Sequence, residues 1–240
     1  MAPNASGEEI LVCLNEVALQ RVQRQQDPLL GRQVLAVKAY QHARFMLTYA
    51  DMLAHPRFGG AARFFLDDLY GPGDFTTRDS QFVRIVPALV RVFPRDIVDT
   101  VLALGRLHAL SERLDTAMGR SAAGLVGHLD GLGLSGKAYG ECWREVGGVA
   151  DRDRQITLML AVGVALEAYT RKPLLRHSLR LMRGPAQAAG MGELQTFLET
   201  GFDTFRAMKG SSEFLETIAR RERLLAAQMF AGADAPALSP

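Results

Sequence analysis

A histidine, a serine and two carboxylates fall on one side of a helix predicted at residues 94–118. These are His108, Ser111, Glu112 and Asp115, and a helical turn of about 100 degrees per residue aligns them in one stripe. A histidine and a glutamate four residues apart can share a metal ion, or the glutamate can orient the imidazole as a general base. Alternatively, the stripe is a solvated surface, where such a pair stabilises the helix by about 0.2–0.5 kcal/mol.

The remaining histidines do not extend this stripe into a metal-binding signature. They are His42, His55, His128 and His177. The chain has no Glu-x-x-His pair and no His-Glu-x-x-His sequence, so the patterns of di-iron bundles and of common zinc hydrolases are missing. A haem needs only one axial histidine from the protein. A haem or metal centre on His108 or His128 therefore stays open as an alternative.

A basic segment, "RKPLLRHSLRLMR", covers residues 171–183 and contains no acidic residue. Arg176, Arg180 and Arg183 lie on one face of the helix predicted there. They could hold a phosphate, a carboxylate ligand or an acidic protein partner. The other interpretation is a solvated face that acidic residues of neighbouring helices partly neutralise.

The stretch "FFLDDLYGPGDFTTRD" covers residues 64–79. Its aspartates could gather around a cation, but the spacing of an EF-hand is absent and Arg78 supplies a counterion. Glycine and proline at 71–73 end a helix, and Thr76 precedes Asp79 by the three residues typical of a helix cap. Turn chemistry accounts for this composition, so the stretch predicts a corner between two helices.

This stretch also carries a resemblance, together with "RGPAQAAG" and "LETGFDTFRAM" further along the chain. The three segments resemble an uncharacterised family of bacterial helical proteins, over most of the chain. The resemblance implies an all-helical fold and a bacterial origin. It assigns no catalytic residue.

Apolar residues recur at three and four positions along nearly the whole chain, which predicts an all-α protein. We expect one domain of eight to ten helices at residues 1–230, with orthogonal or globin-like packing as alternatives to a simple bundle, and a disordered tail at 231–240. The predicted helices cover residues 8–25, 32–54, 58–70, 77–92, 94–118, 137–147, 152–171, 173–183, 192–208 and 212–230. A loop is predicted at "GPAQAAGMG". The helices at 94–118 and 152–171 should form the centre of the fold.

Composition limits the classes of function. The net charge is only +2, so no overall field directs the chain to nucleic acid. The longest nearly apolar run, residues 156–166, is shorter than the roughly 20 residues of a membrane span. The first residues carry two glutamates instead of a secretion signal, which predicts a cytoplasmic protein.

We therefore predict a non-enzymatic binding or regulatory protein for a small anionic ligand or a protein partner. The binding site would be an interhelical pocket or the basic face of Arg176, Arg180 and Arg183. One alternative is a haem- or metal-binding globin-like protein or an enzyme, with His108, Glu112 and Asp115 as weak catalytic candidates. Another is a homo-oligomeric scaffold, such as a homodimer that uses Phe197, Phe202 and Phe205 as interface anchors.

Overall fold

A computed structural model describes residues 5–69, 71, 73–123, 134–236 and 238. Over these residues the chain forms eleven α-helices and one π-helical segment, and it contains no strand. The elements are α1 (Ala5–Gln26), α2 (Pro28–Thr48), α3 (Ala50–Ala54), α4 (Gly59–Arg63), the π-helix η1 (Phe64–Leu69), α5 (Thr76–Val92), α6 (Arg95–Ala122), α7 (Gly136–Glu145), α8 (Val149–Thr170), α9 (Pro173–Ala188), α10 (Gly192–Ala207) and α11 (Ser212–Phe230). The predicted all-α fold class is confirmed.

Most predicted helix ends differ from the observed ones by four residues or fewer, and the three largest differences are the following. The helix predicted at 32–54 divides at Tyr49 into α2 and α3, which brings the count to eleven. The helix predicted at 58–70 is α4 followed by the π-helix η1. In addition, α9 continues through Pro185 to Ala188, where a loop was predicted. Side-chain packing of Ala186, which is buried, holds this last part of α9 against the body.

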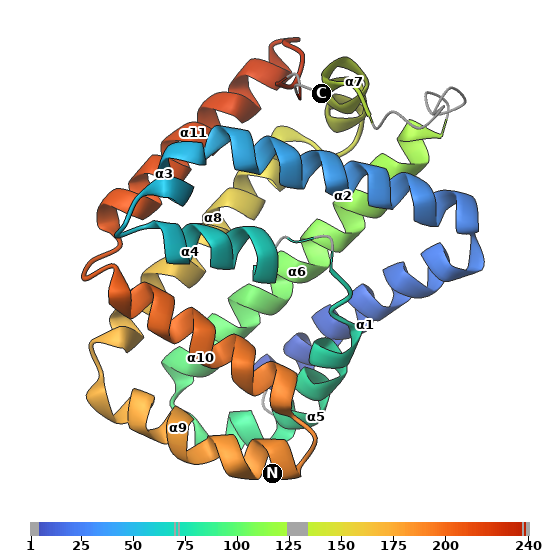
Figure 1. The fold of residues 1–240 in the computed structure, drawn as a ribbon. Helices are drawn as coiled ribbons and strands as arrows, with labels where there is room; N and C mark the ends of the chain where they lie inside the picture. Colours follow the sequence, from blue (N-terminus) through green and yellow to red (C-terminus); the bar gives the residue numbers. More distant parts are fainter. Residues whose placement is uncertain (1–4, 70, 72, 124–133, 237, 239–240) are drawn as a thin grey trace.

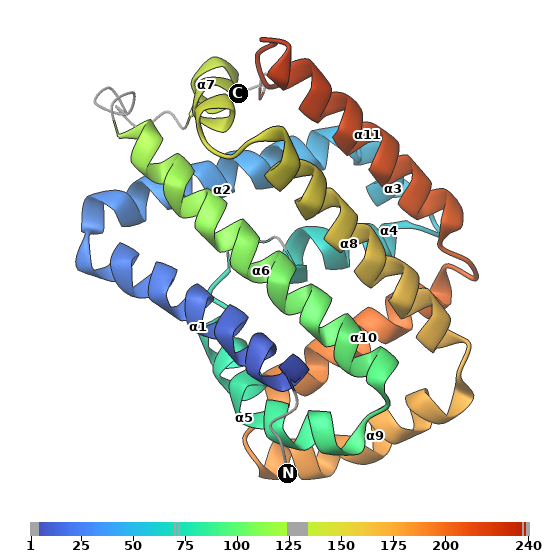
Figure 2. The ribbon, with the colours of Figure 1, turned by 180° about the vertical axis from the view of Figure 1, so that it is seen from behind.

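Four long helices form one layer of the molecule. From behind, α1, α6, α8 and α11 run side by side across the view, and α2 and α10 cross on the other side of them (Figures 1 and 2). The helix α9, which lies between α8 and α10 in the sequence, runs along the lower edge of the molecule in Figure 1. The helix α6 is therefore covered on several sides, by α1, α2 and α8. Its polar side chains must find partners inside the protein.

The apolar core has three parts around this layer. The largest contains Phe58, Phe65, Phe205 and Phe214 between η1, α8, α10 and α11. The others lie between α2, α6 and α7, and between α1, α5 and α6. Phe202 and Phe205 are buried, and Phe197 stacks on Phe64 with 5.4 Å between ring centroids. The phenylalanines suggested as dimer anchors thus pack within the chain.

The corner at residues 64–79 is held by polar contacts across it. Asp74 Oδ1 accepts a hydrogen bond from the Thr76 amide at 2.9 Å, and this aspartate, not Asp79, serves the start of α5. Arg78 donates to the Asp68 carbonyl at 2.6 Å and lies over the Phe75 ring at 4.1 Å. Asp79 is left to point inward.

Residues 233–236 belong to the segment for which we predicted a disordered tail, and they pack against α7. Tyr40 donates to the Pro236 carbonyl at 2.5 Å, and the Ala235 amide donates to the Gly136 carbonyl at 3.2 Å. Ala235 is buried in the core that includes Tyr139 and Trp143. This part of the chain therefore supports α7 from the outside.

Gly163 lies where α8 meets α11 at close range. A Cβ atom built on Gly163 would be 2.5 Å from Leu215 Cδ2. We expect Gly163→Ala to lower the free energy of unfolding by about 1–2 kcal/mol, because overpacking outweighs the gain in helix propensity. Gly184 on α9 has no atom within 4 Å of a built Cβ, so Gly184→Ala should raise stability by up to about 1 kcal/mol. Urea unfolding measures both changes in the free energy of unfolding. Changes of the same sign for Gly163→Ala and Gly184→Ala would contradict this prediction.

Within the described ranges, no helix has the length and apolarity required to cross a bilayer.

Candidate functional site

A cavity of about 130 Å³ lies between α2, α6, α7, α8 and α11, and the corner at residues 64–79 contributes to its wall. In Figure 1, α2, α7 and α11 lie in the upper part of the molecule, and α6 and α8 run downward from it. The wall includes eight polar or charged side chains that bear on its chemistry: Lys38, Gln41, Arg44, Glu112, Asp115, Arg152, Gln155 and Glu222. Burying so many polar groups costs free energy unless each finds a partner. Their concentration around one hollow marks the candidate site.

Glu112 of α6 holds two cations in the cavity wall. Its carboxylate accepts hydrogen bonds from Arg24 of α1 and, at 2.6 Å, from Lys38 of α2. Only 4% of Glu112 is exposed. Burial alone would raise the pKa of this carboxyl, but Lys38 and Arg24 outweigh it and lower the pKa from 4.5 to about 2. Glu112 is therefore a charged hub between three helices.

This lowered pKa predicts a loss of stability in acid. A carboxyl whose pKa is lower in the folded state stabilises the fold above its unfolded pKa, and the contribution disappears as the pH falls through the folded pKa. For Glu112 the window runs from 4.5 down to about 2 and corresponds to roughly 3 kcal/mol. Urea unfolding between pH 6 and pH 3 should show a steeper decline for the wild type than for Glu112→Gln. Parallel curves would contradict this assignment.

Asp115 lies one turn beyond Glu112 and is also buried. Gln41 Nε2 donates to Asp115 Oδ1 at 2.9 Å, while Lys38 Nζ is 3.9 Å from the other oxygen. Burial raises the pKa of Asp115, against the attraction of Lys38. The two carboxyls of α6 thus differ in environment, since one has two close cations and the other mainly a neutral amide.

Glu222 brings a third carboxylate to the cavity from α11. Its Oε1 atom accepts from Arg44 at 2.7 Å and from the Tyr49 hydroxyl at 2.8 Å. These contacts join α2 to α11 across one side of the cavity. Each carboxylate in the wall therefore has a protein donor.

Arg152 of α8 differs from the other cations of the cavity wall because it forms no ion pair with a carboxylate in the described residues. It is 5% exposed, and Nη2 donates to the Val146 carbonyl at 3.2 Å and to Met118 Sδ at 3.4 Å. The guanidinium carbon lies 4.7 Å from the centre of the Trp143 ring. Within the described part of the chain, Nε has no hydrogen-bond partner and no carboxylate lies within 4 Å of the guanidinium. Arg152 is therefore a buried charge without an ion-pair contact there, and Asp115 and Asp151 attract it only from beyond 4 Å.

The four residues of the stripe predicted on α6 do not all interact with one another. His108 Nε2 lies 2.9 Å from Asp79 Oδ2 of α5, and Arg21 donates to the same oxygen at 2.6 Å. His108 thus pairs with Asp79 and not with Glu112. Ser111 accepts from Gln155 Nε2 at 2.8 Å. Since Glu112 and Asp115 are buried, the solvated-surface interpretation of this stripe is wrong.

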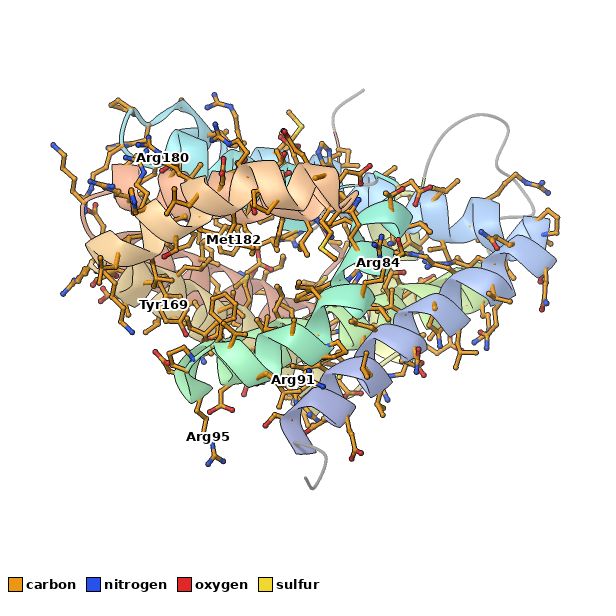
Figure 3. All side chains as sticks on the ribbon, turned by 90° about the horizontal axis from the view of Figure 1, so that it is seen from below. Arg84, Arg91, Arg95, Tyr169, Arg180 and Met182 are labelled. Atoms are coloured by element: carbon orange, nitrogen blue, oxygen red, sulfur yellow. The ribbon has the colours of Figure 1, made fainter. Side chains whose placement is uncertain are left out.

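The predicted basic face of α9 forms ion pairs with the neighbouring helix α10. Arg176 lies 2.9 Å from Asp203, and Arg183 lies 2.5 Å from Glu199, both on α10. Arg180 is exposed on α9 (Figure 3). Two of the three arginines therefore have intramolecular carboxylate partners.

Of the two histidines suggested for haem or metal, only His108 is among the described residues. His128 lies outside those residues. Within them, no group of three or more histidine, cysteine, aspartate or glutamate side chains is arranged to hold a metal ion. His108 borders both the main cavity and a smaller one of about 40 Å³.

Sequence reasoning missed six of the eight polar or charged wall residues, namely Lys38, Gln41, Arg44, Arg152, Gln155 and Glu222. Arg152 stands in the charged sequence "DRDR" at residues 151–154, beside the helix predicted at 152–171. One available signal was α2, where apolar and polar residues are mixed around the helix and no separate apolar face can be distinguished. A helix of that kind is covered on more than one side and has polar groups to satisfy inside the protein.

Comparisons with known proteins identify a family without a described activity. Residues 20–236 match the family described as "Domain of unknown function (DUF8198)". No curated protein matches the chain, and no solved structure does. The matched range contains every wall residue of the cavity discussed above. The chain therefore belongs to this family of unknown function, DUF8198.

Proposed function

We propose that the protein binds a small molecule in the cavity between α2, α6, α7, α8 and α11. The observation that carries this proposal is a polar, charged wall around a hollow large enough for a ligand. Interior space in proteins is normally filled, and the voids that remain are few and small. A polar cavity with a buried cation, Arg152, therefore indicates recognition.

The basic face of α9 supports the proposal less well as a binding site. Arg176 and Arg183 already bond to α10, and an external anion would have to displace those carboxylates. The cavity offers polar groups together with apolar ones, such as Phe45, Leu66 and Met159. This combination is typical of small-molecule sites.

A cavity-blocking pair on α11 tests the proposal. Ala226 lies in the cavity wall, whereas the next residue, Ala227, is exposed. Ala226→Trp should fill the hollow, while Ala227→Trp adds the same side chain to the surface. Ala226→Leu provides a smaller obstruction in case the tryptophan prevents folding.

The measurement is native mass spectrometry of the full chain, purified without denaturation from cells that naturally produce it. The wild type and Ala227→Trp should carry a mass excess that disappears on denaturation. Ala226→Trp should carry none, and Ala226→Leu should carry less. Equal excess masses in all four proteins would place the ligand elsewhere and overturn the proposal.

A further inference from the structure

The charges around the cavity do not balance. Four cations, Arg24, Lys38, Arg44 and Arg152, belong to the wall or bond directly to it, against the carboxylates of Glu112, Asp115 and Glu222. With all of these groups ionised, the arithmetic is four minus three, or one excess positive charge. The excess is located at Arg152, because each of the other cations lies within 4 Å of one of the three carboxylates.

Burying a guanidinium that has no ion-pair partner costs free energy, because the group loses its hydration. Burial disfavours the charged form and lowers the pKa of Arg152 by more than Tyr139, Asp115 and Asp151 raise it, yet arginine does not lose its proton in proteins. A thioether sulfur and one carbonyl are weak compensation for the lost hydration. The Trp143 ring adds a cation–π contact but no counterion. A bound anion would supply what the chain lacks here.

The chemistry of the Arg152 side chain, which lines the cavity, suits a carboxylate. A guanidinium presents its N–H groups as a planar fork that matches the two oxygens of a carboxylate. Gln155 lies three residues further on α8 and also lines the cavity, beside Ser111 of α6. The amide and the hydroxyl can serve a polar substituent of the same ligand.

The size of the cavity limits the rest of the ligand. For comparison, an engineered apolar cavity of about 150 Å³ in a lysozyme variant holds one benzene molecule. The present cavity of about 130 Å³ therefore suits roughly six non-hydrogen atoms. Its apolar wall residues, Phe45, Leu66 and Met159, suit a short carbon body.

We infer that the ligand is a small monocarboxylate of three to five carbons, with its carboxylate bound by Arg152 beside Trp143. This inference rests on the proposed function and specifies its ligand class. One negative charge matches the single excess positive charge. Phosphate fits less well, because near neutral pH it carries between one and two charges and offers no carbon body for the apolar wall.

Titration calorimetry with four carboxylates and their neutral amides tests the inference. The probes are propionate, butyrate, pyruvate and lactate, each with its amide, and inorganic phosphate. At least one carboxylate should bind the wild type in the micromolar to millimolar range and at least tenfold more tightly than its amide. Arg152→Met should lower the affinity for that carboxylate by at least tenfold, because the charged partner of the ligand is lost.

Two further variants separate charge from geometry and from folding. Arg154→Met removes an exposed arginine from the same helix and should bind like the wild type. Arg152→Lys keeps the charge without the fork and should give intermediate affinity. Circular dichroism checks that each variant is folded. If Arg152→Met does not fold, the comparison of acid with amide on the wild type decides alone.

The outcomes distinguish this inference from the proposed function. If no carboxylate exceeds its amide, or if phosphate binds most tightly, the inference is wrong. A cavity-dependent mass excess in native mass spectrometry would then still support the proposed function. If Ala226→Trp binds a carboxylate as well as the wild type does, the cavity is not the site and both fail.

Discussion

Replacing Glu112 by alanine is expected to lower the free energy of unfolding by about 3–5 kcal/mol, because Arg24 and Lys38 are left buried without their shared counterion. For a chain of this length the melting temperature should fall by roughly 6–20 °C. Urea unfolding at neutral pH measures the free energy directly. The control is Glu216→Ala, an exposed glutamate on α11, which should change stability by less than about 0.5 kcal/mol.

A double-mutant cycle with Lys38 shows whether the loss comes from broken ion pairs. Lys38→Met combined with Glu112→Gln removes one charge of each sign and leaves an apolar stem in place of the ammonium. Its loss of stability should be smaller than the sum of the two single losses. Additive losses, or a loss below about 1 kcal/mol for Glu112→Ala, would show that Glu112 is not a structural hub.

The second large effect is expected at Asp79, which joins α5 to α1 and α6. Its Oδ2 atom lies 2.6 Å from Arg21 and 2.9 Å from His108, and Arg78 lies 3.6 Å from Oδ1. Burial raises the pKa of Asp79, but His108 and the two arginines outweigh it, so the pKa is lowered overall. Asp79→Ala should therefore cost about 3–5 kcal/mol, since two largely buried arginines lose a counterion.

Asp79→Asn keeps the shape of the side chain and should lose less than the alanine variant. The neighbouring aspartate of the corner provides the control: Asp67 is exposed and lies 3.3 Å from His42, so Asp67→Ala should change stability by about 0.5 kcal/mol or less. Thermal unfolding followed by circular dichroism compares all three. Equal losses for Asp67→Ala and Asp79→Ala would contradict the role of Asp79.

The general architecture follows from local patterns in the sequence. Periodicity predicted the all-α class and most helix positions, and the helix pair at the centre, α6 and α8, was predicted as the centre. Gly163 is a glycine inside the apolar run at residues 156–166, and the close approach of Leu215 explains why no side chain stands there. Such features depend on residues a few positions apart, or on the absence of a single side chain. They can be read without knowing the tertiary partners.

The wall of the cavity could not be predicted in the same way. Glu112 is paired with residues 88 and 74 positions away, and Asp79 is paired across 58 and 29 positions. A helical wheel assigns a polar stripe to solvent or to a site, but it does not show that α6 is covered on several sides. Asp79 at cap spacing from Thr76 illustrates the same limit, since Asp74 accepts the hydrogen bond from the Thr76 amide and Asp79 lies in the interior.

A crystal structure of the full chain, purified without denaturation from cells that naturally produce it, tests the central claim most directly. We expect non-protein electron density inside the cavity, in contact with the Arg152 guanidinium and absent from Ala226→Trp. A cavity that contains only ordered water, with Arg152 bonded to water or to a protein carboxylate, would contradict the assignment of this cavity as a ligand site.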